Sequence, residues 1–168
     1  MIYDITVTQF SKMLKNLDGI LAKAAQYADA KKIEAEVLLN SRLAPDQLNL
    51  TRQVQIASDS AKLCVAKLTL KEAPMHEDKE TTIAQLRERL AGTIAYLASV
   101  TEKDFNGAEE RRITTPRWEG KTLSGFEYAI QHSIPNVYFH ITVAYEILRH
   151  NGLEIGKKDF LGALPFKS

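Results

Sequence analysis

Hydrophobic residues recur along the chain at the three- and four-residue spacing of an amphipathic helix, in four long segments. The segments cover about residues 4–28, 48–70, 80–100 and 126–152. Polar residues fill the positions between them, so each segment has one face suited to a core. Four such segments with few strand signals predict an all-α protein, in which residues 1–168 form a single four-helix-bundle domain.

The last segment combines a predicted core stripe with polar side chains that could carry chemistry. His132, Asn136 and His140 follow one another at four-residue steps, which places them along one side of a helix. Pro135 lies among them, and a proline inside a helix removes a backbone hydrogen bond and usually causes a kink. The residues expected to face the core are Phe126, Ile130, Val137, Ile141, Ala144, Tyr145 and Leu148.

Two connecting segments are predicted to lack helix. Residues 101–122 contain glycine, proline and β-favouring residues, which predicts an ordered loop with a short hairpin that turns at Glu119 and Gly120. Loops of this length usually have a function, and Trp118 is expected to anchor the end of the bundle or to cover the mouth of a pocket. Residues 71–80 are predicted to form a polar loop with a solvated His76, and the apolar tail beyond residue 152 is expected to dock.

Composition narrows the classes of protein. The formal net charge is +1 with acids and bases interspersed, and mixed runs such as residues 87–89 are expected to be solvated, so we expect no binding to nucleic acid. No apolar run approaches the roughly 20 residues of a membrane span, and we expect no membrane association. The single cysteine, Cys64, cannot form an internal disulfide and is expected to be a small buried apolar side chain. These features favour a cytoplasmic protein.

Three stretches of the sequence are similar to a known family. They are RQVQIASD at residues 52–59, NVYFHITVAYEILRHNG at 136–152 and GKKDFLG at 156–162. They resemble the bacterial domain-of-unknown-function family DUF1993, which is placed in the DinB/YfiT-like superfamily of four-helix-bundle metalloenzymes. The resemblance covers nearly the whole chain. It implies a DinB-like bundle, a divalent nickel or zinc ion held by three histidines, a thiol-linked transferase or hydrolase activity, and a homodimer.

The resemblance also implies where the metal ligands would lie. His140, which precedes Gly152 by twelve residues, matches the second histidine of an HxxxH pair in the last helix. The first histidine of that pair falls on Asn136, and the histidine of the second long helix falls near Gln53 or Gln55. A primary amide is a poorer ligand than imidazole for zinc or nickel, so His140 is the one metal ligand that these positions retain.

The sequence leaves three arrangements of these side chains open. They could form a buried polar network in which His140 and Asn136 face a glutamine, or they could line a small-molecule pocket. Alternatively, a carboxylate such as Asp59 could complete a metal site around His140. We predict a DinB-like bundle whose degenerate metal site acts as a polar pocket for a small ligand. A metal-dependent enzyme and a homodimeric interaction module are the alternatives. The candidate site residues are Gln53, Gln55, Asp59, His132, Asn136 and His140.

Overall fold

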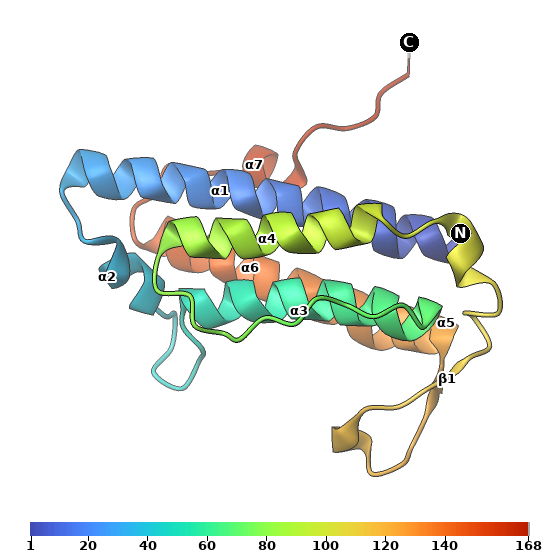
Figure 1. Ribbon diagram of the computed structural model, residues 1–168. Coiled ribbons are helices and arrows are strands. Elements are labelled where there is room, and N and C mark those ends of the chain that lie inside the picture. The colour runs from blue at the N-terminus through green and yellow to red at the C-terminus, as the bar shows by residue number, and fades with distance from the viewer. Residues whose placement is uncertain (168) are drawn as a thin grey trace.

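Four long helices make up most of the computed structural model, which describes residues 1–167. They are α1 (Gln9–Lys31), α3 (Leu50–Thr69), α4 (Ile83–Ala98) and α6 (Ile134–His150). Helices α1 and α3 each pack against both α4 and α6, so the four helices lie side by side (Figure 1). The predicted helical segments are therefore confirmed, with ends that differ by a few residues. Within residues 1–167, every helix is too short or too polar to span a membrane.

The core forms from the apolar stripe of each long helix. Complete burial of a leucine side chain contributes about 1.5–3 kcal/mol, so these stripes supply the main force that holds the helices together. Helix α4 begins at a capping box, in which Thr82 and Gln85 pair their side chains with each other's backbone N–H. The largest side chains that are completely buried are Phe10, Met13, Leu14, Leu17, Ile20, Leu21, Leu50, Leu68, Leu86, Leu90, Leu97 and Ile141.

Short elements occupy the connections. They are η1 (Asp4–Thr8), α2 (Ala35–Asn40), η2 (Glu102–Phe105), β1 (Arg112–Ile113), η3 (Pro116–Trp118), β2 (Leu123–Ser124), α5 (Gly125–Glu127), η4 (Tyr128–Ser133) and α7 (Lys157–Leu161). Strands β1 and β2 are antiparallel, and the chain between them contains Glu119 and Gly120, which both have positive φ. The hairpin predicted in the long loop is therefore present. Trp118 packs edge-on against Tyr128 and His132, which anchors the hairpin to the last helical segment.

Residues 70–82, which we call the strap, connect α3 to α4 without regular helix. Figure 1 shows this segment running back along α3 for most of its length before α4 begins, so α3 and α4 point in the same direction. The strap therefore lies over two helices of the core. Its polar sequence agrees with the predicted loop, but its side chains are engaged with the helices beneath it, as described below.

The prediction that Phe126 and Ile130 face the core is wrong, because these side chains are 45% and 39% exposed. The cause is η4, a π-helical segment that ends two residues before Pro135. A π-helical turn holds an extra residue and rotates everything before it around the helix axis. Tyr128 and Ala129 consequently take the buried positions that a regular helix would give to Ile130 and Phe126.

The tail docks in part. Helix α7 lies against α1, where the Asn16 amide donates to the Phe160 carbonyl oxygen at 2.9 Å and Lys23 pairs with Asp159 at 2.6 Å. Beyond α7 the tail leaves the body of the molecule (Figure 1), and Leu164 and Phe166 are exposed. The predicted docking therefore holds for α7 and fails for these two apolar side chains.

Candidate functional site

The six candidate residues do not form a single cluster. Gln53 and His140 meet between α3 and α6. Asp59, His132 and Asn136 line a pocket further along the same two helices. Gln55 points to another face of α3, where it bonds Glu80 of the strap. The sequence left open whether Gln53 or Gln55 faces His140. In the structure, Gln53 faces it.

Gln53 and His140 form a buried hydrogen bond. His140 Nδ1 lies 2.7 Å from Gln53 Oε1, and Gln53 Nε2 donates to the Leu48 carbonyl oxygen at 2.9 Å. An amide oxygen only accepts hydrogen bonds, so His140 carries its proton on Nδ1 and keeps its lone pair on Nε2. Burial lowers the pKa of His140, which favours the neutral imidazole.

Asn136 bonds a different residue of α3. Its Nδ2 donates to Ser60 Oγ at 2.7 Å. At the positions where the resemblance implies three histidines, the chain therefore has one imidazole and two amides, and both amides already have protein partners. Such a donor set does not fit zinc or nickel, which prefer imidazole, thiolate and carboxylate ligands. Residues 1–167 contain no group of three or more His, Cys, Asp or Glu side chains placed to hold a metal ion.

A pocket of about 320 Å³ lies between α3, η4 and the loop before η3. We call it the α3–η4 pocket. Most of its wall is apolar, which is typical of sites for small organic molecules. The residues that line it are Ile56, Asp59, Ser60, Leu63, Lys67, Thr115, Pro116, Tyr128, His132, Ser133 and Asn136. Three of the six candidate residues therefore contribute to this one pocket.

Ser133 is the most unusual polar group in the wall of the α3–η4 pocket. Its side chain is buried, with 2% exposure, and its Oγ makes no hydrogen bond of ordinary geometry to any residue in 1–167. The polar groups beside it are the Cys64 thiol, which is a weak hydrogen-bonding group, and the Tyr128 hydroxyl. No sequence pattern indicated that Ser133 would be buried, because the π-helical segment turns it inward.

The groups around Ser133 are uncharged. Burial raises the pKa of Tyr128 to about 12 and that of Cys64 to about 12, and the neighbouring Ser133 hydroxyl opposes both shifts. The Cys64 thiol therefore stays protonated near neutral pH, as expected for a small buried side chain. His132 stacks on Tyr128 with ring centres 5.3 Å apart, and burial lowers its pKa as well. The inner wall thus offers neutral hydrogen-bonding groups beside apolar carbon.

A second polar cluster centres on Arg89, and the prediction that residues 87–89 form a solvated face is wrong for this residue. The Arg89 side chain is 1% exposed, and it pairs with Asp59 at 2.7 Å, Asp78 at 2.7 Å and Glu80 at 2.8 Å. Arg87, by contrast, pairs at the surface with Asp18. The sequence did indicate that Arg89 would be buried. It falls on the same helical face as Leu86 and Thr93, which are buried and lie three and four residues away from it.

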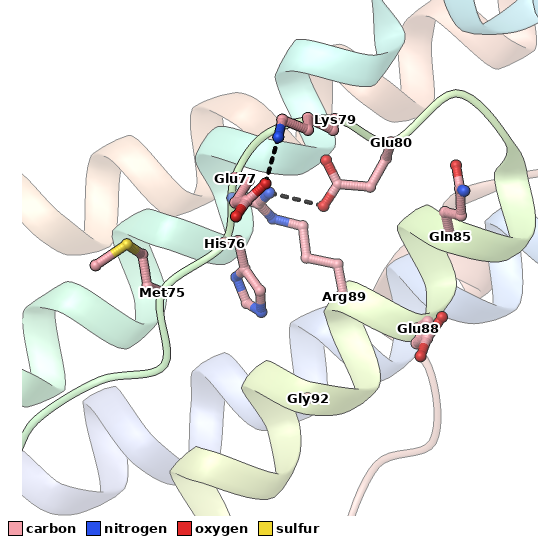
Figure 2. Close-up of a pocket in the computed structure, with 9 residues that line it drawn as sticks. All are labelled: Met75, His76, Glu77, Lys79, Glu80, Gln85, Glu88, Arg89 and Gly92. Atoms are coloured by element: carbon pink, nitrogen blue, oxygen red, sulfur yellow. Dashed lines mark hydrogen bonds and ion pairs between the residues drawn. The ribbon is translucent and has the colours of Figure 1, made fainter.

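The same cluster fixes the strap. Lys62 is almost fully buried and lies 2.8 Å from Asp59 and 2.6 Å from His76 Nδ1. The expected solvation of His76 is therefore wrong, and Figure 2 shows its ring turned toward α4. Burial alone would raise the pKa of Glu80, but hydrogen bonds from Arg89 and Gln55 outweigh this effect and the pKa is lowered. Glu80 consequently stays ionised and holds the strap against α4.

Two comparisons with known proteins found a match. A family model described as "Domain of unknown function (DUF1993)" matches residues 2–161. The chain is also similar to a solved structure described as a DinB family member protein from Shewanella denitrificans. The two sequences are 60% identical over 100% of this chain and 96% of the other, and the TM-score is 0.96. No curated protein matches the chain at a significant level.

Proposed function

Since the chain belongs to the DUF1993 family, we propose that it is a DinB-like four-helix-bundle protein that binds a small, largely apolar molecule in the α3–η4 pocket. The observation that carries this proposal is the mainly apolar wall of this pocket, which contains the buried Ser133 hydroxyl beside the Cys64 thiol and the Tyr128 hydroxyl. A ligand with one hydroxyl or carbonyl group would form a hydrogen bond with a polar side chain of the wall while its carbon skeleton covers Ile56, Leu63 and Pro116.

The contacts of His140 and Asn136 support a function that does not depend on a metal. Gln53 and Ser60 hold these side chains in direct hydrogen bonds across α3 and α6. A metal-dependent enzyme would have to break both contacts and complete its ligand set from amides. Binding of a small molecule needs no such rearrangement, because the α3–η4 pocket is already formed.

A homodimer is a second proposal, and exposed apolar side chains favour it. Phe126, Ile130 and Phe139 of the last helical segments are 39–55% exposed, and large exposed apolar side chains are typical of association surfaces. A second copy of the chain is the proposed occupant of this surface. Association predicts that the midpoint of thermal unfolding rises with protein concentration. A midpoint that is the same at low and high concentration would contradict the homodimer.

Trp118 gives a direct test of the ligand proposal. It is the single tryptophan, and its ring lies 5.3 Å from that of His132 and 6.0 Å from that of Tyr128, which both line the α3–η4 pocket. We expect benzyl alcohol and cyclohexanol to change the Trp118 fluorescence in a saturable manner. Toluene, which has the shape of benzyl alcohol without the hydroxyl, should bind more weakly.

Ser133→Ala is the variant that isolates the hydrogen bond. It should weaken benzyl alcohol about five- to tenfold, which corresponds to one hydrogen bond of roughly 1 kcal/mol, and leave toluene unchanged. Ser99→Ala, at an exposed serine after α4, is the matched control and should have no effect. A linear, non-saturating response to both alcohols, or equal affinity of benzyl alcohol for the native protein and Ser133→Ala, would contradict the proposal.

A further inference from the structure

The α3–η4 pocket has a single carboxylate in its lining, that of Asp59. Ile56 and Leu63, which line the pocket beside it, lie three and four residues away on the same face of α3. The carboxylate therefore stands next to apolar carbon. Its two oxygens have different surroundings, and this difference indicates which molecules the pocket selects.

One oxygen of Asp59 is held by two buried cations. Asp59 Oδ1 lies 2.7 Å from a terminal nitrogen of Arg89 and 2.8 Å from Lys62 Nζ. The side chains of these cations are only 1% and 4% exposed, so neither is free to move into solvent. Charge-assisted hydrogen bonds from two different helices fix the orientation of the carboxylate before any ligand arrives.

The other oxygen of Asp59 is open to a ligand. Oδ2 makes no hydrogen bond to any residue in 1–167, and it is accessible, because the buried side-chain oxygens without a partner in this range belong only to Gln47 and Ser133. The Asn136 amide nitrogen is used by Ser60, so the Asn136 oxygen is a second acceptor in the same wall. Carboxylate and amide oxygens only accept hydrogen bonds, so the ligand must bring the donor.

The two cations behind Asp59 do not make the pocket positive. Arg89 also pairs with Asp78 at 2.7 Å and with Glu80 at 2.8 Å, and Figure 2 shows the contact with Glu80. Arg52 pairs with Asp78 in turn, so three carboxylates face three cations and the cluster is formally neutral. Of these six groups, Asp59 alone lines the α3–η4 pocket. The nearest charge to a ligand at this place is therefore negative.

The other titratable groups of the lining do not oppose a cation at Asp59. Lys67 lies eight residues further along α3, about 12 Å away along the helix axis, and salt screens charges beyond about 8 Å. Its ammonium group donates to the Thr114 carbonyl oxygen at 2.8 Å. Burial lowers the pKa of His132, which favours the neutral ring, and raises that of Tyr128 to about 12, which keeps its hydroxyl protonated.

On the basis of the proposed function, we propose that the α3–η4 pocket selects a small primary amine with an apolar body. The protonated amino group of the ligand donates to Asp59 Oδ2, and its carbon body covers Leu63 and Pro116. Asp59 consequently sets the specificity of the pocket. An alcohol can donate to the same oxygen, but it lacks the positive charge that strengthens the bond.

Four ligands of similar shape test the class: benzylamine, benzyl alcohol, toluene and benzoate. Each is titrated into the full chain near neutral pH, where benzylamine is protonated, and Trp118 fluorescence reports binding. We expect benzylamine to bind about tenfold more tightly than benzyl alcohol, and benzoate to bind more weakly than benzyl alcohol. If benzyl alcohol binds and benzylamine binds no more tightly, or benzoate binds best, the amine proposal is overturned while the proposed function stands. If none of the four binds in a saturable manner, both fail.

Asp59→Asn tests the residue, because it removes the charge and keeps the shape of the side chain. The ratio of the benzyl alcohol and benzylamine dissociation constants should fall from about ten to about one. Asp29→Asn is the matched control, at an exposed carboxylate of α1 without an ion-pair partner among residues 1–167, and should keep the ratio at about ten. A ratio that Asp59→Asn leaves unchanged would overturn the assignment.

The native protein provides a test that does not depend on whether Asp59→Asn folds, which circular dichroism checks. Salt screens an ion pair that is partly open to water and has little effect on a neutral ligand. Between about 0.05 M and 0.5 M sodium chloride, benzylamine should therefore lose about two- to fivefold in affinity relative to benzyl alcohol. The same salt dependence for both ligands would overturn the proposal.

Discussion

At the scale of single residues, the hydrogen bond between Gln53 and His140 lies where the DinB-like resemblance implies a metal ion. The bond fixes the imidazole proton on Nδ1, and Gln53 is fixed in turn by the Leu48 carbonyl group. A single glutamine side chain thus satisfies two groups, the His140 Nδ1–H and the Leu48 carbonyl oxygen. The contact links α3 to α6, and its removal should lower the free energy of unfolding.

We therefore expect Gln53→Ala to lower the free energy of unfolding by about 1–3 kcal/mol, because it leaves His140 Nδ1 and the Leu48 carbonyl oxygen without partners. Urea unfolding followed by circular dichroism measures the change. Gln26→Ala, at an exposed position of α1, is the control and should alter stability by less than about 0.5 kcal/mol. Equal effects of the two substitutions would show that the buried contact does not contribute.

Arg87 and Arg89 form a natural pair for comparison, because they are two residues apart on α4 and face opposite environments. Arg89→Met should destabilise the fold by about 3 kcal/mol, since it leaves three carboxylates without their common cation. We place the effect at the low end for a broken buried pair because these carboxylates keep some contact with water. Arg87→Met should cost about 0–1 kcal/mol, as for surface pairs. Similar losses for both variants, measured by urea unfolding, would contradict the central role of Arg89.

The side-chain partners of Arg89, His140 and Asn136 could not be predicted from the sequence, for a physical reason. The partners of Arg89 come from α3 and from the strap, and nothing local in residues 87–89 indicates that these elements meet there. The spacing of His140 and Asn136 placed them on one side of a helix, but their partners Gln53 and Ser60 depend on how α3 and α6 are aligned. Pairing between helices is a property of packing rather than of local pattern.

At the scale of elements, helical periodicity predicted the long helices well, because each helix buries a stripe that repeats with the geometry of its own backbone. The hairpin was also predictable, since Glu119 and Gly120 adopt left-handed conformations that suit a turn. The π-helical segment before Pro135 was not predicted, and it changed the face of every residue before it. This shift exposed Phe126 and turned Ser133 inward, so the same local irregularity shaped the α3–η4 pocket.

The strap is the element whose stability should depend most on pH. Burial, together with the positive charges of Lys62 and Arg89, lowers the pKa of His76 below its ordinary value of 6.5, while Asp59 and Glu80 act in the opposite direction. The unfolded chain consequently binds a proton at His76 before the folded chain does. The stability from neutral His76 is complete above pH 6.5 and is lost as the pH falls toward the lower folded pKa.

We expect the free energy of unfolding of the native protein to fall more steeply between pH 7.5 and pH 5 than that of His76→Gln. The variant keeps His132 and His140, whose pKa values burial also lowers, so the difference between the two slopes isolates His76. Urea unfolding at a series of pH values provides the measurement. Parallel slopes would show that His76 does not couple the strap to pH.

At the scale of the whole molecule, the chain has two polar regions, which meet at Asp59 of α3. The α3–η4 pocket has a mainly apolar wall, whereas the pocket between α4 and the strap is bordered by three carboxylates and two cations. Completely buried side chains of the core hold together the helices that carry both regions. Sequence patterns alone predicted the core, but they merged the two regions into one site because residues of both lie on α3.

The central claim is that the α3–η4 pocket binds a small molecule without a metal. Amide chemical-shift mapping by NMR with benzyl alcohol tests it most directly, in buffer with and without a chelator. We expect shifts centred on Ser60, Tyr128 and Ser133 that the chelator does not alter. Shifts centred on Gln53 and His140 that vanish with the chelator, or no shifts at the pocket, would contradict the claim.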